Sequence, residues 1–306
     1  MIDKKIIIGS RGSKLALNYA ERAKNEICSK LSIKEKNLEI KKIITEGDKI
    51  KDVRLSDTGG KGLFSKTIEN ELLNNKIDIA VHALKDMPSD ETSGLITNCF
   101  LERNDPREVL ISRDKKKFND LNKGSIIGTS SFRREFQFKR IRNDLKYKLI
   151  RGNVDTRIKK LNEKNFDAII LSFAGLYSLK LDQNITQIFS TSEIIPSAGQ
   201  GTIALQCRES DGEIIKILKK INHELTYKCV IAERDVLKTL NGDCETPIGV
   251  FAHIKNNELN LETELFSLDG KDRFYESLST ELKNFKKIGL EVGTILKKKS
   301  KNSYKR

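Results

Sequence analysis

The first two-thirds of the chain alternates short runs rich in β-branched residues with segments of helical periodicity. Strands are predicted at residues 5–8, 38–44, 77–81, 125–127, 148–150, 167–171 and 202–206, with helices at 13–31, 64–73, 132–142 and 154–161. Such alternation is typical of α/β folds, in which helices cover mostly parallel sheets. Because ligands bind these folds where loops leave the carboxyl ends of strands, residues directly after strands are the first candidates for a site.

Two segments are predicted to cross between lobes. One is Arg-Asn-Asp-Pro at 103–106, and the other is Pro-Ser-Ala-Gly-Gln-Gly at 196–201. A chain that leaves one α/β lobe and later returns to it forms a two-lobed clamp with a central cleft. Such a division would place residues 1–102 and 200–220 in a first lobe and residues 106–196 in a second lobe.

The pattern changes after residue 224. A long helix at 224–240 is followed by strands at 248–254 and 259–266 and by a final helix. This order predicts a smaller C-terminal α+β domain at residues 224–306. In the first lobe, the short helix at 64–73 is expected to turn Ile68, Leu72 and Leu73 toward the core.

The net charge of +14 is compatible with a nucleic-acid or membrane partner. However, Lys, Asn and Ile are abundant throughout, a compositional bias that needs no partner, and no helix-turn-helix, zinc-finger or RNP pattern accompanies the charge. No apolar run reaches the 18 or so residues of a membrane span, and the N-terminus lacks a signal-peptide pattern. We expect a cytoplasmic protein that binds neither nucleic acid nor membrane.

The five cysteines are odd in number, widely spaced and never in a C-x-x-C pair. This spacing argues against a disulfide framework and against a zinc site, so no metal is expected. Four of them lie within helix or strand patterns and are expected in the core. Cys244 instead lies in a Gly- and Pro-punctuated loop, Asn241-Gly242-Asp243-Cys244-Glu245-Thr246-Pro247. A lone loop thiol is ordinarily inert, but its position also suits a nucleophile.

Further motifs occur along the chain in the following order. They are Gly59-Gly60-Lys61-Gly62-Leu63-Phe64, His82-Ala83-Leu84-Lys85-Asp86-Met87-Pro88, Gly128-Thr129-Ser130-Ser131-Phe132-Arg133-Arg134, Arg151-Gly152-Asn153 and Gly199-Gln200-Gly201. Together with the Cys244 loop, this set resembles the porphobilinogen deaminases, or hydroxymethylbilane synthases, from about residue 6 to about residue 254. The resemblance implies two lobes similar to the periplasmic-binding-protein fold, a monomer, and a dipyrromethane cofactor held by a thioether to Cys244.

The reaction implied by the resemblance joins four porphobilinogen units head to tail. Each unit loses ammonia as its pyrrole nitrogen becomes cationic. The free α-carbon of the growing chain then attacks the resulting cation, and a proton is lost from that carbon. Asp86 matches the catalytic acid of the family, and a carboxylate can both stabilise that cation and move protons. On local sequence alone, Asp86 before Met-Pro also fits a helix cap or a turn.

Each porphobilinogen unit carries an acetate and a propionate, and Arg binds carboxylates in bidentate fashion. Besides Cys244, the cofactor is expected to contact Lys85, Ser131, Arg133 and Arg134. The substrate is expected to contact Arg11, Ser13, Lys61, Phe64, Ser130, Arg151, Arg157 and Gln200. Any single one of these residues is also explained as an ordinary helix cap or a surface arginine, and Phe64 also fits a position in the core.

The sequence departs from the usual family residues at three positions. Ala83 stands where Ser is usual, Asp57 where Lys is frequent, and Ser178 where Arg often contacts the growing chain. Residues 46–60 are polar and lack periodicity, which predicts a surface loop. The alternative is a non-enzymatic solute-binding module with the same two lobes, although such a module has no use for Cys244 or for a third domain.

Overall fold

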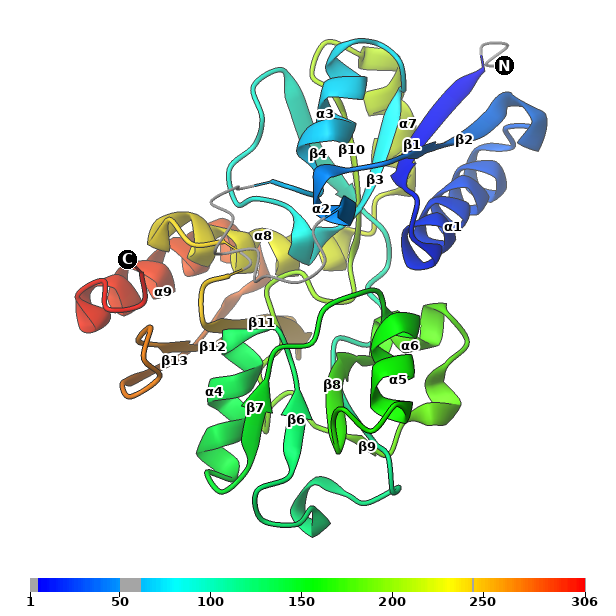
Figure 1. Ribbon diagram of the computed structural model, residues 1–306. Coiled ribbons are helices and arrows are strands. Elements are labelled where there is room, and N and C mark those ends of the chain that lie inside the picture. The colour runs from blue at the N-terminus through cyan, green and yellow to red at the C-terminus, as the bar shows by residue number, and fades with distance from the viewer. Residues whose placement is uncertain (1–4, 50–61, 244, 306) are drawn as a thin grey trace.

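The computed structural model describes residues 5–49, 62–243 and 245–305. Within these residues, the strands form two five-stranded sheets and one three-stranded sheet. Figure 1 shows the two larger sheets in separate lobes, one above the other, with the third sheet and two long helices beside them. The expected fold class, two α/β lobes and a C-terminal α+β domain, is confirmed.

The sheet of the first lobe has the strand order β2-β1-β3-β10-β4. Its strands are β1 (Ile6–Arg11), β2 (Leu38–Ile43), β3 (Ile79–Ala83), β4 (Leu95–Phe100) and β10 (Ile203–Arg208). β10 runs antiparallel to β3 and β4, whereas β1 pairs in parallel with β2 and β3. Four strands therefore point one way. Apolar clusters pack α1 (Lys14–Leu31) and α7 (Gly212–Ile221) on one face of this sheet and α3 (Lys66–Leu73) on the other.

The sheet of the second lobe has the order β7-β6-β8-β5-β9. Its strands are β5 (Glu108–Ser112), β6 (Ile126–Gly128), β7 (Lys146–Lys148), β8 (Ala168–Ser172) and β9 (Gln187–Ile188), and its helices are α4 (Phe132–Ile141), α5 (Val154–Asn162) and α6 (Phe173–Ser178). Here β5 is the reversed strand. In each lobe, the reversed strand is the first strand that the chain forms after it arrives from the other lobe. We call the two connections, residues 101–107 and 189–202, the crossings.

The C-terminal domain is an antiparallel sheet covered by two helices. It consists of α8 (Glu224–Leu240), β11 (Ile248–Lys255), β12 (Glu258–Phe266), β13 (Arg273–Glu281) and α9 (Phe285–Ser300). The buried carboxylate of Glu233 accepts hydrogen bonds from Arg103 Nη1 at 2.6 Å, from the Gly199 amide at 2.6 Å and from the Ala252 amide at 2.8 Å. Because Arg103 and Gly199 lie in different crossings, Glu233 joins this domain to both.

Several predicted details differ from the structure. The strand expected at 148–150 lies at Lys146–Lys148. Ile68 and Leu72 face the core, but Leu73 is 41% exposed, so its predicted burial is wrong. A short helix, α2 (Glu46–Lys49), occupies the start of the segment predicted as loop, and residues 50–60 lie outside the described chain.

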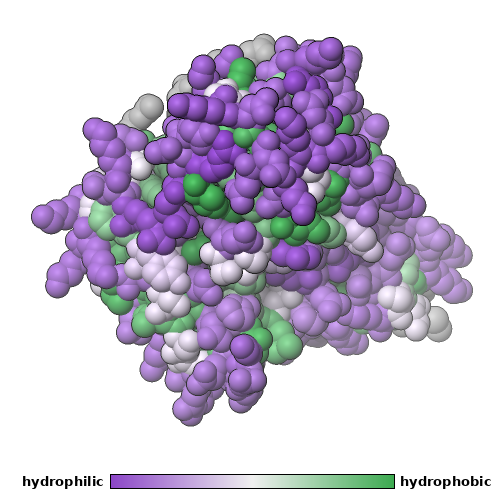
Figure 2. Space-filling view, turned by 90° about the horizontal axis from the view of Figure 1, so that it is seen from below, coloured by the Kyte–Doolittle hydropathy of each residue, from purple (hydrophilic) through white to green (hydrophobic). Residues whose placement is uncertain are grey.

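The surface agrees with the high content of charged residues. The view from below in Figure 2 shows a mainly hydrophilic face on which hydrophobic residues form small, separated patches. Among the described helices, none combines the length and the apolarity that a membrane crossing requires.

Candidate active site

A cavity of about 860 Å³ lies between the two lobes and reaches the C-terminal domain. Each part of the molecule contributes to its wall, for example through Arg11, Arg157 and Thr246. The lining includes every predicted site residue that the structure describes, twelve in all. They are Arg11, Ser13, Phe64, Lys85, Asp86, Ser130, Ser131, Arg133, Arg134, Arg151, Arg157 and Gln200. The sequence motifs therefore meet around one space.

The strand topology explains why these residues meet. Arg11 is the last residue of β1, and Lys85 and Asp86 lie in a 3₁₀ turn, Leu84–Asp86, directly after β3. Ser130 and Ser131 follow β6 in the second lobe. The carboxyl ends of parallel strands share one edge of a sheet, and these edges of the two lobes face the cavity.

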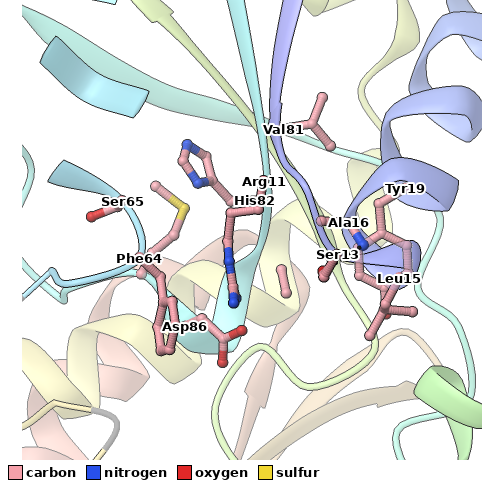
Figure 3. Close-up of a pocket in the computed structure, with 12 residues that line it drawn as sticks. Arg11, Ser13, Leu15, Ala16, Tyr19, Phe64, Ser65, Val81, His82 and Asp86 are labelled. Atoms are coloured by element: carbon pink, nitrogen blue, oxygen red, sulfur yellow. Dashed lines mark hydrogen bonds between the residues drawn. The ribbon is translucent and has the colours of Figure 1, made fainter. Parts of the chain in front are cut away.

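A charged and aromatic group forms the first-lobe wall. The guanidinium carbon of Arg11 lies 3.9 Å from the ring centroid of Phe64, which is a cation–π contact. Figure 3 shows the Arg11 side chain pointing toward Phe64 and Asp86, with Tyr19 and Leu15 on the opposite side of a small side pocket. A carboxylate, a cation and an aromatic ring face the cavity together here.

A buried network forms the floor of the cavity. Lys85 Nζ donates to Gln200 Oε1 at 3.1 Å, and Gln200 Nε2 donates to Glu108 Oε1 at 2.9 Å. Arg133 Nη2 donates to the same oxygen at 2.6 Å. Arg134 Nη2 lies 2.8 Å from Glu108 Oε2, an ion pair whose angle falls outside hydrogen-bond geometry. Two arginines therefore contact one carboxylate directly, and Lys85 is linked to it through Gln200.

The charges of this network change the protonation of its members. Burial raises the pKa of Glu108, but the charges of Arg134, Arg133 and Lys85 outweigh it and hold the pKa at about 2. Burial, together with the charge of Arg134, lowers the pKa of Lys85 to about 8. Glu108 is thus ionised at neutral pH, whereas Lys85 exchanges its proton close to neutral pH.

Second-lobe residues add further cationic groups. Arg157 Nε donates to the Gly152 carbonyl at 2.8 Å, and Arg157 Nη2 donates to Ser130 Oγ at 3.5 Å. Burial, with the charges of Arg134 and Arg151, lowers the pKa of Arg157 to about 10. Positive charge is therefore crowded on this wall, which suits an anionic ligand.

The two serines predicted at helix starts do cap helices. Ser13 Oγ accepts the Ala16 amide at 3.3 Å, and Ser131 Oγ accepts the Arg134 amide at 3.4 Å. The alternative of helix capping therefore holds for Ser13 and Ser131, which also line the cavity.

Two predicted site residues, Lys61 and Cys244, lie outside the described residues, as does Asp57. The neighbours of Cys244 in sequence, Asp243 and Glu245, both line the cavity. The Glu245 amide donates to Asp243 Oδ1 at 2.9 Å, and the Asp243 amide donates to Thr246 Oγ1 at 2.9 Å. The Cys244 loop thus borders the space where the predicted site residues meet.

Sequence analysis missed several lining or supporting residues. They are Tyr19, Lys42, Glu108, Asn153, Asp155 and Lys160. For Glu108 a signal exists, because a carboxylate opens the otherwise apolar run Glu-Val-Leu-Ile just after a predicted crossing. Of the departures from the family pattern, Ala83 ends β3 in the small side pocket and Ser178 ends α6.

Comparisons with known proteins extend over nearly the whole chain. Residues 6–216 match the family model "Porphobilinogen deaminase, dipyromethane cofactor binding domain", and residues 227–298 match "Porphobilinogen deaminase, C-terminal domain". The chain is 40% identical to the porphobilinogen deaminase of Alkaliphilus metalliredigens, covering 97% of this chain and 93% of that one. It is 43% identical to that of a Geobacillus species, with coverages of 96% and 94%.

The comparison with solved structures finds more distant similarities. One is the second substrate binding domain of a putative amino acid ABC transporter from Streptococcus pneumoniae, with a TM-score of 0.44 and 15% identity over 71% of this chain and 92% of that one. Another is a BvgS VFT2 domain from Bordetella pertussis, with a TM-score of 0.42 and 13% identity over 71% and 85%. By the two family models and by identity over nearly its full length, the chain belongs to the porphobilinogen deaminase family.

Proposed function

We propose that this protein joins four porphobilinogen units head to tail, with loss of ammonia at each step, to give hydroxymethylbilane. In this proposal, the units are added to a dipyrromethane cofactor held by a thioether to Cys244. The observation that supports it most is the convergence of twelve predicted site residues on one interlobe cavity, which the Cys244 loop borders.

The other four cysteines are less suited than Cys244 to anchor the cofactor, because burial makes their thiols hard to ionise. Burial raises the pKa of Cys99 and of Cys229 to about 12 and that of Cys207 to about 11, and it also raises the pKa of Cys28. Because the thiolate is the nucleophile, these four thiols are poor candidates at neutral pH. Cys244 is the remaining cysteine, in a loop whose neighbours line the cavity.

Asp86 is the proposed catalytic residue. Its carboxylate accepts the pyrrole N–H of the bound porphobilinogen and stabilises the cation that forms as ammonia leaves. It also takes part in moving the proton to the departing amine or from the attacking carbon. At about 4 Å and an effective dielectric constant of about 20, one such charge contact is on the order of 4 kcal/mol before the cost of desolvation.

The cationic wall fits the acetate and propionate groups of the implied cofactor. Arg134 Nε is buried and has no hydrogen-bond acceptor among the described residues. Burial, and after it the charges of neighbouring arginines, lower the pKa values of Lys85 and Arg157, and an anionic ligand beside them would oppose both shifts. Once bound, dipyrromethane supplies the terminal ring to which new units are joined. Its carboxylates are assigned to Lys85, Ser131, Arg133 and Arg134.

The carboxylates and rings of the substrate are assigned to the remaining lining residues. Arginine forks take the carboxylates, and Phe64 offers a ring face beside Arg11. This set comprises Arg11, Ser13, Lys61, Phe64, Ser130, Arg151, Arg157 and Gln200. We further propose that the protein is a cytoplasmic monomer with lobes at residues 1–102 plus 200–220 and 106–196, and a C-terminal domain at 224–306.

Intact mass spectrometry of the purified protein tests this function. We expect a mass above that of the sequence by two linked pyrrole units, with the added mass on the peptide that contains Cys244. Cys244→Ser should remove both the added mass and the consumption of porphobilinogen. A solute-binding module instead predicts the plain sequence mass and reversible binding without turnover. An unmodified but fully active protein would contradict the proposed anchor.

A further inference from the structure

Glu108 is the first residue of β5 and its side chain is fully buried where the chain enters the second lobe. Its two oxygens contact residues from the second lobe and from a crossing. Arg133 and Gln200 donate to Oε1 at 2.6 and 2.9 Å, and Arg134 Nη2 lies 2.8 Å from Oε2. Glu108 does not itself line the interlobe cavity, whereas these three partners do. Any role in the site must therefore act through them.

The two arginines that contact Glu108 also donate hydrogen bonds to backbone carbonyls. Arg133 Nη1 donates to the Ile195 carbonyl at 3.0 Å, and Arg134 Nη1 donates to the Ile170 carbonyl at 3.1 Å. Each guanidinium is thus fixed between the carboxylate and a backbone oxygen. Such fixation sets the direction of the donors that remain, which matters for a planar group that binds carboxylates through two parallel bonds.

The same carboxylate is linked to Lys85 through Gln200. The amide of Gln200 accepts from Lys85 Nζ at 3.1 Å and donates both to Glu108 and, at 2.7 Å, to the Pro106 carbonyl. This places Lys85 of the first lobe and the two arginines of the second lobe around one negative charge. Three cations packed this closely repel one another unless a buried anion lies between them.

We propose that Glu108 is a positioning residue of this site, which orients Arg133 and Arg134 toward the cavity and, through Gln200, keeps the Lys85 ammonium charged for the carboxylates of the bound chain. The role given to these carboxylates rests on the proposed function. The electrostatic part, in which Glu108 controls the protonation of Lys85, depends on the protein alone.

The protonation of Lys85 is sensitive to such control. Burial, and after it the charges of Arg134 and Arg133, lower its pKa, Asp86 and Glu108 oppose the shift, and the net result is a pKa of about 8. Among the described residues, these four are the charged groups that act on the pKa of Lys85. Removing the charge of Glu108 leaves Asp86 as the opposing anion, so the midpoint of Lys85 should move to lower pH.

The test compares Glu108→Gln, Glu108→Asp and the unchanged full-length protein. Competitive acetylation of lysines over a range of pH, read by peptide mass spectrometry, gives the titration of Lys85 without reference to activity. We expect the Lys85 midpoint to fall by about half a pH unit or more in Glu108→Gln. It should stay near the original value in Glu108→Asp, and the labelling of Lys298 in α9 should be the same in all three proteins.

A double variant separates charge from folding. Glu108→Gln combined with Gln200→Glu returns a carboxylate to the position that contacts Lys85, so the Lys85 midpoint should return to the original value or rise above it. In the activity assay, the alkaline limb of the pH profile should move with the Lys85 midpoint.

An unchanged Lys85 midpoint in folded Glu108→Gln would overturn the proposal, as would failure of both Glu108→Gln and the double variant to fold, since Glu108 would then be purely structural. If the protein carries no dipyrromethane but the Lys85 midpoint still shifts, the proposed function fails and the inference about Glu108 stands.

Discussion

Asn18 on α1 donates a 2.7 Å hydrogen bond from Nδ2 to the backbone carbonyl of Ser178 on α6, and this bond joins the two lobes directly. Figure 1 shows these helices next to each other at the boundary between the lobes. A second pair lies nearby, with Lys14 Nζ 3.6 Å from Asp155 Oδ2. The closed arrangement of the cavity therefore depends on these side-chain contacts as well as on the crossings.

Asn18→Ala should make this closed arrangement less favourable. An exposed hydrogen bond contributes about 1 kcal/mol or less, so we expect KM for porphobilinogen to rise roughly two- to fivefold with kcat little changed. Asn25→Ala, at an exposed position of the same helix, is the matched control and should leave KM unaltered. Equal KM values for the two variants in steady-state assays would show that the contact has no effect on closure.

Asp86→Asn tests the proposed catalytic carboxylate. The change keeps the size and most hydrogen bonding of the side chain but removes its charge. We expect the protein to fold and to retain its cofactor mass while porphobilinogen consumption falls by at least about two orders of magnitude, the scale typical of a lost acid–base group. Asp90→Asn is the control, because Asp90 is exposed and only four residues away. Near-normal turnover in Asp86→Asn would return Asp86 to a capping role.

Arg151→Leu separates binding in the cavity from overall charge. Arg151 lines the cavity, and a charge-assisted hydrogen bond contributes about 1.5–3 kcal/mol, so apparent substrate affinity should fall roughly ten- to a hundredfold. Arg151→Lys should rescue only in part, because a point charge cannot replace the planar fork. Neutralising Lys297, Lys298 and Lys299 on α9 should leave activity unchanged. The opposite pattern would mean that the net basic charge binds the substrate.

The sequence was sufficient to predict features that depend on local pattern. The helix expected at residues 224–240 is α8 at Glu224–Leu240, and the strand ends that carry Arg11 and Asp86 meet at one cavity because parallel topology requires it. Strand β13 was not predicted, since its residues alternate between exposed and half-buried and carry few apolar side chains. Edge strands of this kind give a weak alternation signal.

Contacts between residues far apart in the chain were beyond sequence reasoning. Glu108 can be recognised as a carboxylate in an apolar strand, but nothing local indicates that its partners are Arg133, 25 residues later, and Gln200, 92 residues later. The error at Leu73 is of another kind. Helical periodicity was applied up to the last residue of α3, where one step around the helix separates buried Leu72 from exposed Leu73.

Substitutions at Leu72 and Leu73 measure how much stability each face of α3 contributes. Leu72 is fully buried in a cluster with Ile68 and Ile77, whereas Leu73 is 41% exposed. Leu72→Ala should lower the free energy of unfolding by about 2–5 kcal/mol, and Leu73→Ala by about 1 kcal/mol or less. Urea unfolding followed by circular dichroism measures both. Similar losses for the two variants would contradict the orientation of α3.

His82 should make the protein sensitive to acid. It lies buried in β3, and its Nε2 has no hydrogen-bond partner among the described residues. Burial lowers its pKa from 6.5 to about 4; the nearby Gln206 side chain opposes the shift, and the charge of Arg11 adds to it. Since the folded pKa lies below the unfolded one, the unfolded chain binds the proton first. Stability is therefore lost as the pH falls from about 6.5 toward 4.

Between pH 7 and pH 4.5, this single group should reduce the free energy of unfolding by about 2 kcal/mol. His82→Gln does not titrate and keeps a polar group that can reach Gln206, so its loss over the same interval should be smaller by about that amount. Carboxylates such as Glu108, whose pKa of about 2 lies below this window, contribute in the same way to both proteins. Urea titrations at the two pH values measure the difference. If both proteins lose the same stability, the imidazole either accepts the proton in the folded state or already lies open to water, which would contradict its burial beside Arg11.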